Sequence, residues 1–437
     1  MKSSILFKGV DMVLPNGIFH GDLLAEDGKI AAIGPALKEH AATVISDKGL
    51  TLMPGAIDPH VHFREPGLTW KEDLESGSRA AVSGGVTTFF DMPNTDPSAT
   101  TAELIEQKKF VASEKSLANY NFFIGATDDN LDELIKIKNV PGIKVYAGST
   151  TGNLLVKKLE NIFAHAPHLI AVHSEDEDTI RANKEKYRGS QDVSDHMRIR
   201  SWEAALKSTE RVIALAKKYS KRLHICHMST AEETDLIAEE NNPLITCEVT
   251  PQHLFLYAPE IYKKLGTFAQ MNPPLREKRH GERLWRGLKE GTVHCIGTDH
   301  APHTIEEKSK PFGQAPSGIP GVELMLPVML NTGASLENVA RWTSSNASRV
   351  FGIKNKGQLK VGFDADLVLV DTKAKRKMEN KNLHTKAKWS AFEGWTLTGW
   401  PVATVVNGHV VFREGDFFSE LKGKEARCYT RAYEEKE

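Results

Sequence analysis

The chain has 437 residues, of which 40% are hydrophobic and 26% are charged, so it can build one large globular domain and a smaller one. Its 56 Lys and Arg nearly balance its 57 Asp and Glu, and the formal net charge of -1 argues against nucleic acid or an anionic membrane as the partner. No apolar run reaches the roughly 20 residues of a membrane span, and the N-terminal apolar stretch is too short for a signal peptide. The four cysteines show no CxxC spacing and are expected to be reduced thiols. We therefore expect a cytoplasmic protein whose partner is a small molecule.

The two ends of the chain have the pattern of short strands joined by turns. Residues 1–54 contain apolar runs separated by Gly, Asp and Asn, and a similar texture returns after residue 355. Near the C-terminus an Asn-Gly pair stands between two apolar runs, which is typical of a hairpin. Because neither end has enough apolar surface alone, we expect residues 1–54 and 356–437 to pair into one small composite β-sandwich.

Residues 55–355 alternate strand-like apolar runs with helical stretches. Segments such as EAALKSTERVIALAKKY, residues 203–219, carry apolar residues at helical spacing. Eight strands are predicted, within residues 55–63, 85–93, 119–127, 142–148, 168–175, 222–230, 244–251 and 292–300. Continuous apolar strands that alternate with helices favour a closed (β/α)8 barrel, and an open doubly wound sheet is the alternative.

Polar side chains recur where the predicted strands end, and in a parallel barrel these ends form one face. The i, i+2 spacing of His60 and His62 puts both imidazoles on one side of a strand, where they can bind the same ion. A single histidine at a strand end is more often an ordinary buried residue, so the recurrence carries the inference. Imidazole and carboxylate ligands suit zinc and related divalent ions. The six candidate metal ligands are His60, His62, Lys144, His173, His227 and Asp299.

Lys144 is the unusual member of this group, because an ammonium beside metal ions would be repelled. A deprotonated lysine can react with carbon dioxide to form a carbamate, which is an anion able to bridge two metals. The negative charges of this carbamate, Asp299 and a hydroxide would not fully neutralise two divalent metal ions. The site would therefore be mildly positive and would favour an anionic substrate. An ordinary surface or core lysine is the alternative, and the sequence pattern leaves both open.

Nine stretches along the chain form a recognisable series in order and spacing: MPGAIDPHVHFREPG, WKEDLESGSRAAVSGGVTTFFDMPNT, IKVYAGSTTGN, VHSEDE, HICHMSTAEE, CEVTPQHL, MNPPLR, IGTDHAPH and GFDADLVLVD. Through them the chain resembles the dihydroorotases of the amidohydrolase superfamily along nearly its whole length. The resemblance implies a (β/α)8 barrel with a composite β-sandwich and a binuclear zinc centre. The implied reaction is the reversible cyclisation of N-carbamoyl-L-aspartate to L-dihydroorotate, with loss of water, in pyrimidine biosynthesis.

The resemblance also implies how the ligands divide between two Zn²⁺ ions. His60, His62, Lys144 and Asp299 would hold one ion, and Lys144, His173 and His227 the other, with carboxylated Lys144 and a hydroxide as bridges. Relatives bridged by aspartate carry it where this chain has Gly148, Ser149 and Thr150, so Lys144 is favoured, with Asp128 and Asp129 as a fallback. Asp299 would also be the catalytic proton carrier.

For the substrate, the resemblance implies that Arg64, Asn94 and His303 hold a carboxylate and that Asn272 contacts the ring. Ser317 and Gly318 match a backbone contact. An arginine offers a planar fork suited to a carboxylate, although Arg64 could instead pair with Glu65 or Glu72, and Asn94 could be a turn residue.

Arg64 discriminates between related activities, because allantoinases and hydantoinases share the metal ligands but generally lack an arginine at this position. The competing interpretations are another cyclic amidase, a non-catalytic subunit that has lost its ligands, and a mononuclear deaminase. A homodimer is also considered. Residues 303–318 could form a mobile loop over the site or a static one, and Glu65 has no predicted role.

Overall fold

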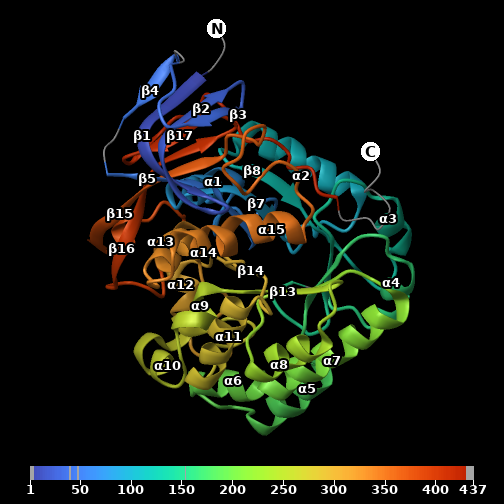
Figure 1. The fold of residues 1–437 in the computed structure, drawn as a ribbon. Coiled ribbons are helices and arrows are strands. Elements are labelled where there is room, and N and C mark those ends of the chain that lie inside the picture. Colours follow the sequence, from blue (N-terminus) through green and yellow to red (C-terminus); the bar gives the residue numbers. More distant parts are fainter. Residues whose placement is uncertain (1–3, 39–40, 47–48, 153, 430–437) are drawn as a thin grey trace.

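The computed structural model describes residues 4–38, 41–46, 49–152 and 154–429, and its centre is a barrel of parallel strands (Figure 1). The third strand is split in two, because β8 pairs with the strand before it and β9 with the strand after it. The barrel strands are β6 (Ala56–Val61), β7 (Val86–Asp91), β8 (Asn119–Phe122), β9 (Ile124–Gly125), β10 (Ile143–Tyr146), β11 (Ile170–His173), β12 (Leu223–Ile225), β13 (Ile245–Val249) and β14 (Cys295–Ile296).

The barrel closes between its last and first strands. Val61 of β6 forms a parallel bridge with His300, which follows β14, and the amide of His62 donates to the carbonyl of His300 at 2.8 Å. All eight predicted strand positions are therefore occupied, and the (β/α)8 prediction is confirmed. The barrel strands are buried on both faces, as their continuous apolar runs require.

Helices surround the strands. The predicted helix at residues 203–219 is α7, which buries one face and ends at Ser220, a residue in the left-handed conformation with φ 50°. The helices are α1 (Leu74–Ser83), α2 (Ala102–Lys115), α3 (Leu131–Lys136), α4 (Leu159–His165), α5 (Glu177–Lys186), α6 (His196–Ile199), α7 (Trp202–Tyr219), α8 (Ala231–Glu240), α9 (Pro251–Phe255), α10 (Glu260–Leu265), α11 (Lys278–Glu290), α12 (Ile305–Lys308), α13 (Met325–Leu330), α14 (Leu336–Ala340) and α15 (Asn346–Val350).

The two β-rich ends of the chain lie together at one side of the barrel, in blue and orange-red in Figure 1. They form one hydrogen-bonded sheet of nine strands, because β5 pairs with β1 on one side and with β15 on the other. The predicted Asn-Gly hairpin joins β16 to β17 through Asn407 and Gly408, both with positive φ. The strands are β1 (Ser4–Leu14), β2 (Gly17–Glu26), β3 (Lys29–Gly34), β4 (Thr43–Ile45), β5 (Thr51–Pro54), β15 (Leu367–Lys377), β16 (Thr396–Val406), β17 (His409–Arg413) and β18 (Asp416–Phe417).

The expected pairing of the chain ends is thus confirmed, while the boundaries at residues 54 and 355 stay predictions. All four cysteines are free and buried, as expected. Among the described residues, no helix combines the length and apolar character that crossing a membrane requires.

Candidate functional site

A cavity opens where the barrel strands end, and every predicted metal ligand lines it. Its volume is about 20 Å³, which is room for about one water molecule. His303, the one predicted site residue outside the lining, contacts the guanidinium of Arg64. The lining residues are His60, His62, Arg64, Asn94, Lys144, Tyr146, Thr150, Thr151, His173, His227, Asn272, Asp299, Ala301, Ser317 and Gly318. The structure therefore brings the predicted site residues together, and their individual roles stay predictions.

The six predicted metal ligands form a cluster, here called the metal-ligand cluster, and one half of it consists of His60, His62 and Asp299. Asp299 Oδ1 lies 3.0 Å from His62 Nε2 and 3.4 Å from His60 Nε2. Two ligand atoms on one tetrahedral zinc are about 3.4 Å apart, since each lies about 2.1 Å from the ion, so this spacing suits a shared metal. Asp299 has a φ of 47°, in the left-handed region, so the chain turns sharply as it presents this carboxylate.

The other half contains Lys144, His173 and His227, which come from three different strand ends. His173 Nδ1 lies 3.0 Å from His227 Nε2, and the Lys144 ammonium lies 3.1 Å from the sulfur of Cys226. His227 Nδ1 is buried without a hydrogen-bond partner among the described residues. His173 Nδ1 and His227 Nε2 face each other at a separation that suits two ligands of one ion.

The two aspartates considered as an alternative bridge lie elsewhere. Asp128 Oδ1 accepts hydrogen bonds from the amides of Lys157 and Lys158, at 2.9 and 2.8 Å. Asp129 is exposed, and neither residue lines the cavity. Of the two predicted sources of a bridging anion, only Lys144 is in place.

Most histidines of the cluster have lowered pKa values, because burial disfavours the charged ring. Burial lowers the pKa of His62 to about 4 and that of His227 well below its ordinary value. For His60, burial and the Lys144 ammonium lower the pKa, but the Glu248 carboxylate outweighs them and raises it to about 10. Neutral imidazole is the form that binds metal, so His62 and His227 are already in the state that a ligand needs.

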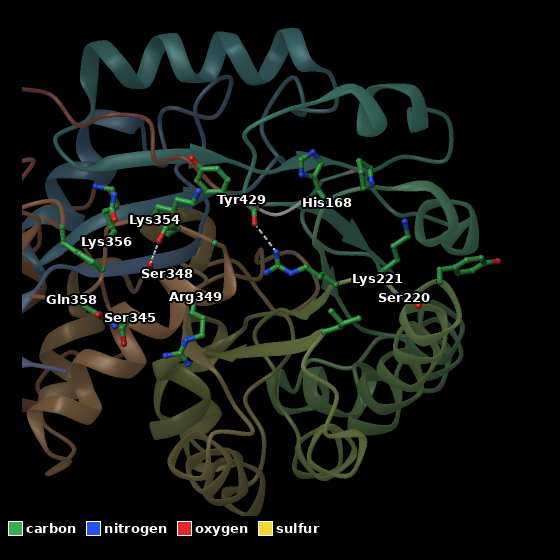
Figure 2. Close-up of a pocket in the computed structure, with 18 of the residues that line it drawn as sticks. His168, Ser220, Lys221, Ser345, Ser348, Arg349, Lys354, Lys356, Gln358 and Tyr429 are labelled. Atoms are coloured by element: carbon green, nitrogen blue, oxygen red, sulfur yellow. Dashed lines mark hydrogen bonds between the residues drawn. The ribbon is translucent and has the colours of Figure 1, made fainter. Parts of the chain in front are cut away.

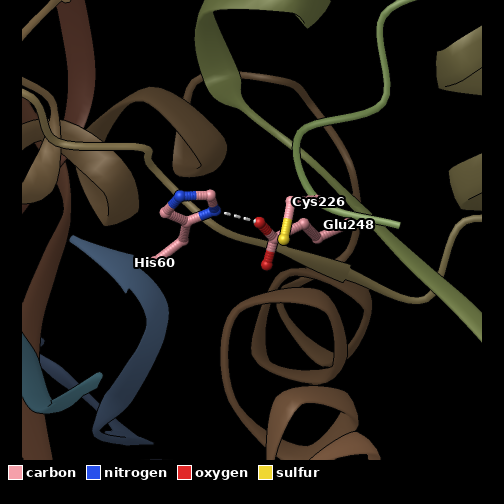
Figure 3. A group of neighbouring side chains, drawn as sticks. All are labelled: His60, Cys226 and Glu248. Atoms are coloured by element: carbon pink, nitrogen blue, oxygen red, sulfur yellow. Dashed lines mark hydrogen bonds and ion pairs between the residues drawn. The ribbon is translucent and has the colours of Figure 1, made fainter. Parts of the chain in front are cut away.

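Glu248, at the end of β13, was not predicted from the sequence, yet it contacts ligands in both halves of the cluster. Its Oε1 lies 2.5 Å from His60 Nδ1 and accepts from the His227 amide at 3.3 Å, while Oε2 lies 3.2 Å from His224 Nε2. Figure 3 shows its carboxylate directed at His60, with Cys226 alongside. A separation of 2.5 Å is too short for two ligands of one ion and fits a hydrogen bond. Glu248 therefore fixes His60 with Nδ1 protonated and Nε2 toward the cavity.

We expect Glu248→Gln to weaken metal binding, because the amide is a poorer acceptor for His60. The metal affinity should fall by about 10- to 100-fold, measured by competition with a chelator. Glu233→Gln is the matched control, since Glu233 is also buried but accepts from Thr209 and Thr230 instead. Equal metal affinities in the two variants would contradict this role of Glu248.

Arg64 lies beside the metal-ligand cluster and is buried, with 1% of its surface exposed. Its Nε donates to the carbonyl of Pro302 at 3.3 Å, and its Nη1 has no hydrogen-bond partner among the described residues. The two glutamates considered as its partners are otherwise engaged. Glu65 accepts from the Leu74 amide at 2.9 Å and pairs with Lys115 at 2.5 Å, which gives Glu65 a structural role. Glu72 accepts from side chains and amides around residues 76 and 385–386.

Asn94 is part of the site rather than a simple turn residue. Its Oδ1 lies 2.6 Å from His62 Nδ1, and its Nδ2 donates to the carbonyl of Thr151 at 2.9 Å. Asn94 therefore orients His62 as Glu248 orients His60. This role was not predicted, because the sequence gives no sign that the two residues, 32 positions apart, are in contact.

The other predicted substrate residues border the same cavity. Asn272 Nδ2 donates to Thr150 Oγ1 at 3.1 Å, and its Oδ1 is buried without a partner among the described residues. The Gly318 amide donates to the carbonyl of Gln270 at 2.9 Å, and the carbonyl of Ser317 lies 3.1 Å from His303 Nε2. Tyr146, which was not predicted, also lines the cavity, and its hydroxyl is buried and unpartnered within the described part of the chain.

A much larger cavity, of about 1360 Å³, lies at the opposite end of the barrel. Its lining residues His168, Arg222 and Leu244 precede β11, β12 and β13, which places it at the amino-terminal ends of the strands. Figure 2 shows the basic side chains of Lys221, Arg349, Lys354 and Lys356 around it. Catalytic groups of (β/α)8 barrels lie at the carboxyl-terminal face, and none of the predicted site residues lines this cavity. The smaller cavity is therefore the candidate active site.

Comparisons with known proteins place the chain in a family. The model of the amidohydrolase family matches residues 51–411. The chain is 34% identical to a dihydroorotase of Methanosarcina acetivorans, over 94% of this chain and 92% of that one. It is 35% identical to a dihydroorotase of Methanothermobacter thermautotrophicus, over 90% of each chain.

Among solved structures, an L-hydantoinase (dihydropyrimidinase) from Arthrobacter aurescens matches with a TM-score of 0.92 and 29% identity, over 98% of this chain and 100% of that one. The predicted resemblance to dihydroorotases and the prediction of a hydrolase are both confirmed. The chain belongs to the amidohydrolase family.

Proposed function

We propose that this protein is a dihydroorotase, which interconverts N-carbamoyl-L-aspartate and L-dihydroorotate. The observation that carries the proposal is Arg64, a buried guanidinium that lines the same cavity as the metal-ligand cluster and whose Nη1 is unpartnered among the described residues. A buried arginine without a carboxylate partner is costly, and a carboxylate on the substrate would offset that cost. The curated relatives named dihydroorotase support the same activity.

Membership of the amidohydrolase family implies a metal centre, and the residues present fit one. His60, His62, Lys144 and Asp299 would hold one divalent ion, and Lys144, His173 and His227 the other. Lys144 would take part as a carbamate, and zinc is the ion that we propose. Bound ions would polarise the amide carbonyl and lower the pKa of water.

The chain's own residues would then bind the substrate and move the proton. In ring opening, water adds to the amide carbonyl, and the bond from this carbon to the ring nitrogen breaks. Asp299 accepts the proton of the attacking water and passes it to the departing nitrogen. In ring closure, the ureido nitrogen attacks the carboxyl carbon, and Asp299 carries the proton from this nitrogen to the oxygen that departs as water. Arg64, Asn94 and His303 hold the substrate carboxylate, Asn272 contacts the ring, and Ser317 and Gly318 offer a backbone contact.

A second candidate is hydantoinase activity on a ring without a carboxylate. The solved structures of hydantoinases favour it, since their fold covers nearly the whole chain. Arg64 argues against it, because a ring without a carboxylate would leave the guanidinium unpaired. The clustering of all six ligand candidates also argues against a non-catalytic subunit or a mononuclear deaminase.

We expect Arg64→Met to raise KM for dihydroorotate by about 100-fold, because the substrate loses a charge-assisted and forked hydrogen bond. The effect on kcat should be small, because the group acts on binding. Arg79→Met, which removes a half-exposed arginine paired with Glu75, is the control and should behave as wild type. An unchanged KM in Arg64→Met would sink the assignment of the carboxylate site.

Two further expectations stay predictions: a homodimer in solution, and a cytoplasmic location.

A further inference from the structure

Lys71 lies in the loop between β6 and α1. Among the described residues, it is the only lysine whose ammonium contacts His303. Its Nζ lies 3.1 Å from His303 Nδ1 and 3.0 Å from Glu307 Oε1. Lys71 and His303 are both buried. They are 232 positions apart in the chain, so the pairing is created by the fold.

The geometry around His303 decides which ring nitrogen carries the proton. An ammonium can only donate, so Nδ1, which faces Lys71, must accept. A neutral ring then has its hydrogen on Nε2, which lies 3.1 Å from the carbonyl oxygen of Ser317 and can donate to it. Both contacts are within normal hydrogen-bond distance.

The other tautomer fits less well. Protonated Nδ1 would face the Lys71 ammonium, and its only acceptor among the described residues would be Glu307 at 3.6 Å. Unprotonated Nε2 would face the Ser317 oxygen, with Arg64 Nη2 at 3.4 Å as its donor. Each favourable contact in this arrangement is longer than its counterpart in the first. Its two unfavourable contacts, with Lys71 and with the Ser317 oxygen, are both at 3.1 Å, whereas those of the first arrangement, with Arg64 and Glu307, are at 3.4 and 3.6 Å.

The doubly protonated ring is also disfavoured. Burial, Arg64 and Lys71 lower the pKa of His303 to about 3, although Glu307 opposes them. The ring therefore stays neutral in the neutral pH range, with one donor and one acceptor.

We propose that Lys71 is a positioning residue that holds His303 as its Nε2–H tautomer, so that the ring presents a hydrogen-bond donor beside Arg64 to the substrate. This proposal rests on the proposed function, because it explains how the site would select a carboxylate. Arg64 and His303 then offer donors only, and the Ser317 carbonyl accepts the His303 hydrogen when no substrate carboxylate does. A hydrogen-donating ring substituent would face donors only at Arg64 and His303.

Hydrogen bonds also hold the backbone on both sides of His303. The Trp389 indole donates to the His303 carbonyl at 2.8 Å. The buried Lys308 ammonium donates to the carbonyls of Gln270 and Pro316, each at 2.9 Å. These bonds hold the backbone around His303, whereas Lys71 contacts the ring itself.

The first test needs no substrate. The ¹⁵N shifts of the His303 ring, identified by their loss in His303→Gln, should show the Nε2–H tautomer in the wild type. In Lys71→Met they should move toward the Nδ1–H tautomer. A wild-type ring protonated on Nδ1, or unchanged shifts in Lys71→Met, would overturn the proposal.

The second test is kinetic. Lys71→Met should raise KM for dihydroorotate about tenfold, the weakening expected for one hydrogen bond to a charged group, with little change in kcat. Lys71→Arg keeps a donor and should lie closer to the wild type. Lys109→Met, at a buried lysine paired with Glu106 and Glu425, is the control and should match the wild type.

A fall in kcat at unchanged KM, or the same KM in Lys71→Arg as in Lys71→Met, would contradict the proposal. If the wild type does not turn over dihydroorotate, the proposed function fails, while the ring shifts still decide the tautomer.

Discussion

Asp299→Asn should lower kcat roughly a thousandfold, because the amide can occupy the same position but cannot accept the proton. Asp299 Oδ1 lies beside both His60 and His62, so the substitution also removes one charge from that half of the cluster. The second half of the cluster does not depend on Asp299, and the variant should still bind at least one ion per chain. Steady-state kinetics together with the metal content of the purified variant measure both effects.

The control for this experiment is Asp128→Asn, since Asp128 lies outside the cavity and accepts hydrogen bonds from the amides of Lys157 and Lys158. Its kcat should equal that of the wild type. A kcat for Asp299→Asn within tenfold of the wild type, with normal metal content, would remove Asp299 from the proton-transfer role.

Lys144→Met should abolish turnover and reduce the bound metal to less than about one ion per chain. Lys144 is proposed to hold both ions, so its loss should affect both halves of the cluster. Methionine has nearly the same volume as lysine, so the substitution should preserve the packing of the buried site. Metal content and thermal unfolding of the variant would separate loss of the centre from loss of the fold.

The carbamate itself can be detected in the wild type. Apoprotein reconstituted with zinc in ¹³C-labelled bicarbonate should show one carbamate carbon signal, and that signal should be absent from Lys144→Met. Full activity of Lys144→Met with two bound ions, or a carbamate signal that persists in it, would contradict the assignment of the bridge.

The sequence predicts the barrel and the metal-ligand candidates because both follow from local patterns. Apolar runs that alternate with helices predict parallel strands, and polar residues at the ends of those strands must meet at one face. His60 and His62 are additionally brought to one side by the period of a strand. The strand-end positions place the histidines and Asp299 in one cavity, whereas the pattern alone leaves Lys144 open as an ordinary lysine.

The residues that orient the side chains of the site could not be predicted in this way. Glu248 contacts His60 across 188 positions, and Lys71 contacts His303 across 232. A glutamate at a strand end and a lysine in a loop are common, and their contacts depend on side-chain directions that only the packed barrel fixes. The same holds for the contact of Asn94 with His62, while the proposed contact of Asn94 with the substrate stays a prediction.

The most direct test of the proposed function is to follow the interconversion of L-dihydroorotate and N-carbamoyl-L-aspartate by the purified, zinc-loaded protein, with hydantoin, dihydrouracil and allantoin as parallel substrates. The account predicts turnover in both directions for the carboxylated pair and a kcat/KM at least about 100-fold lower for the rings without a carboxylate. Faster hydrolysis of hydantoin or dihydrouracil than of dihydroorotate would contradict it and would assign the protein to the hydantoinase activity instead.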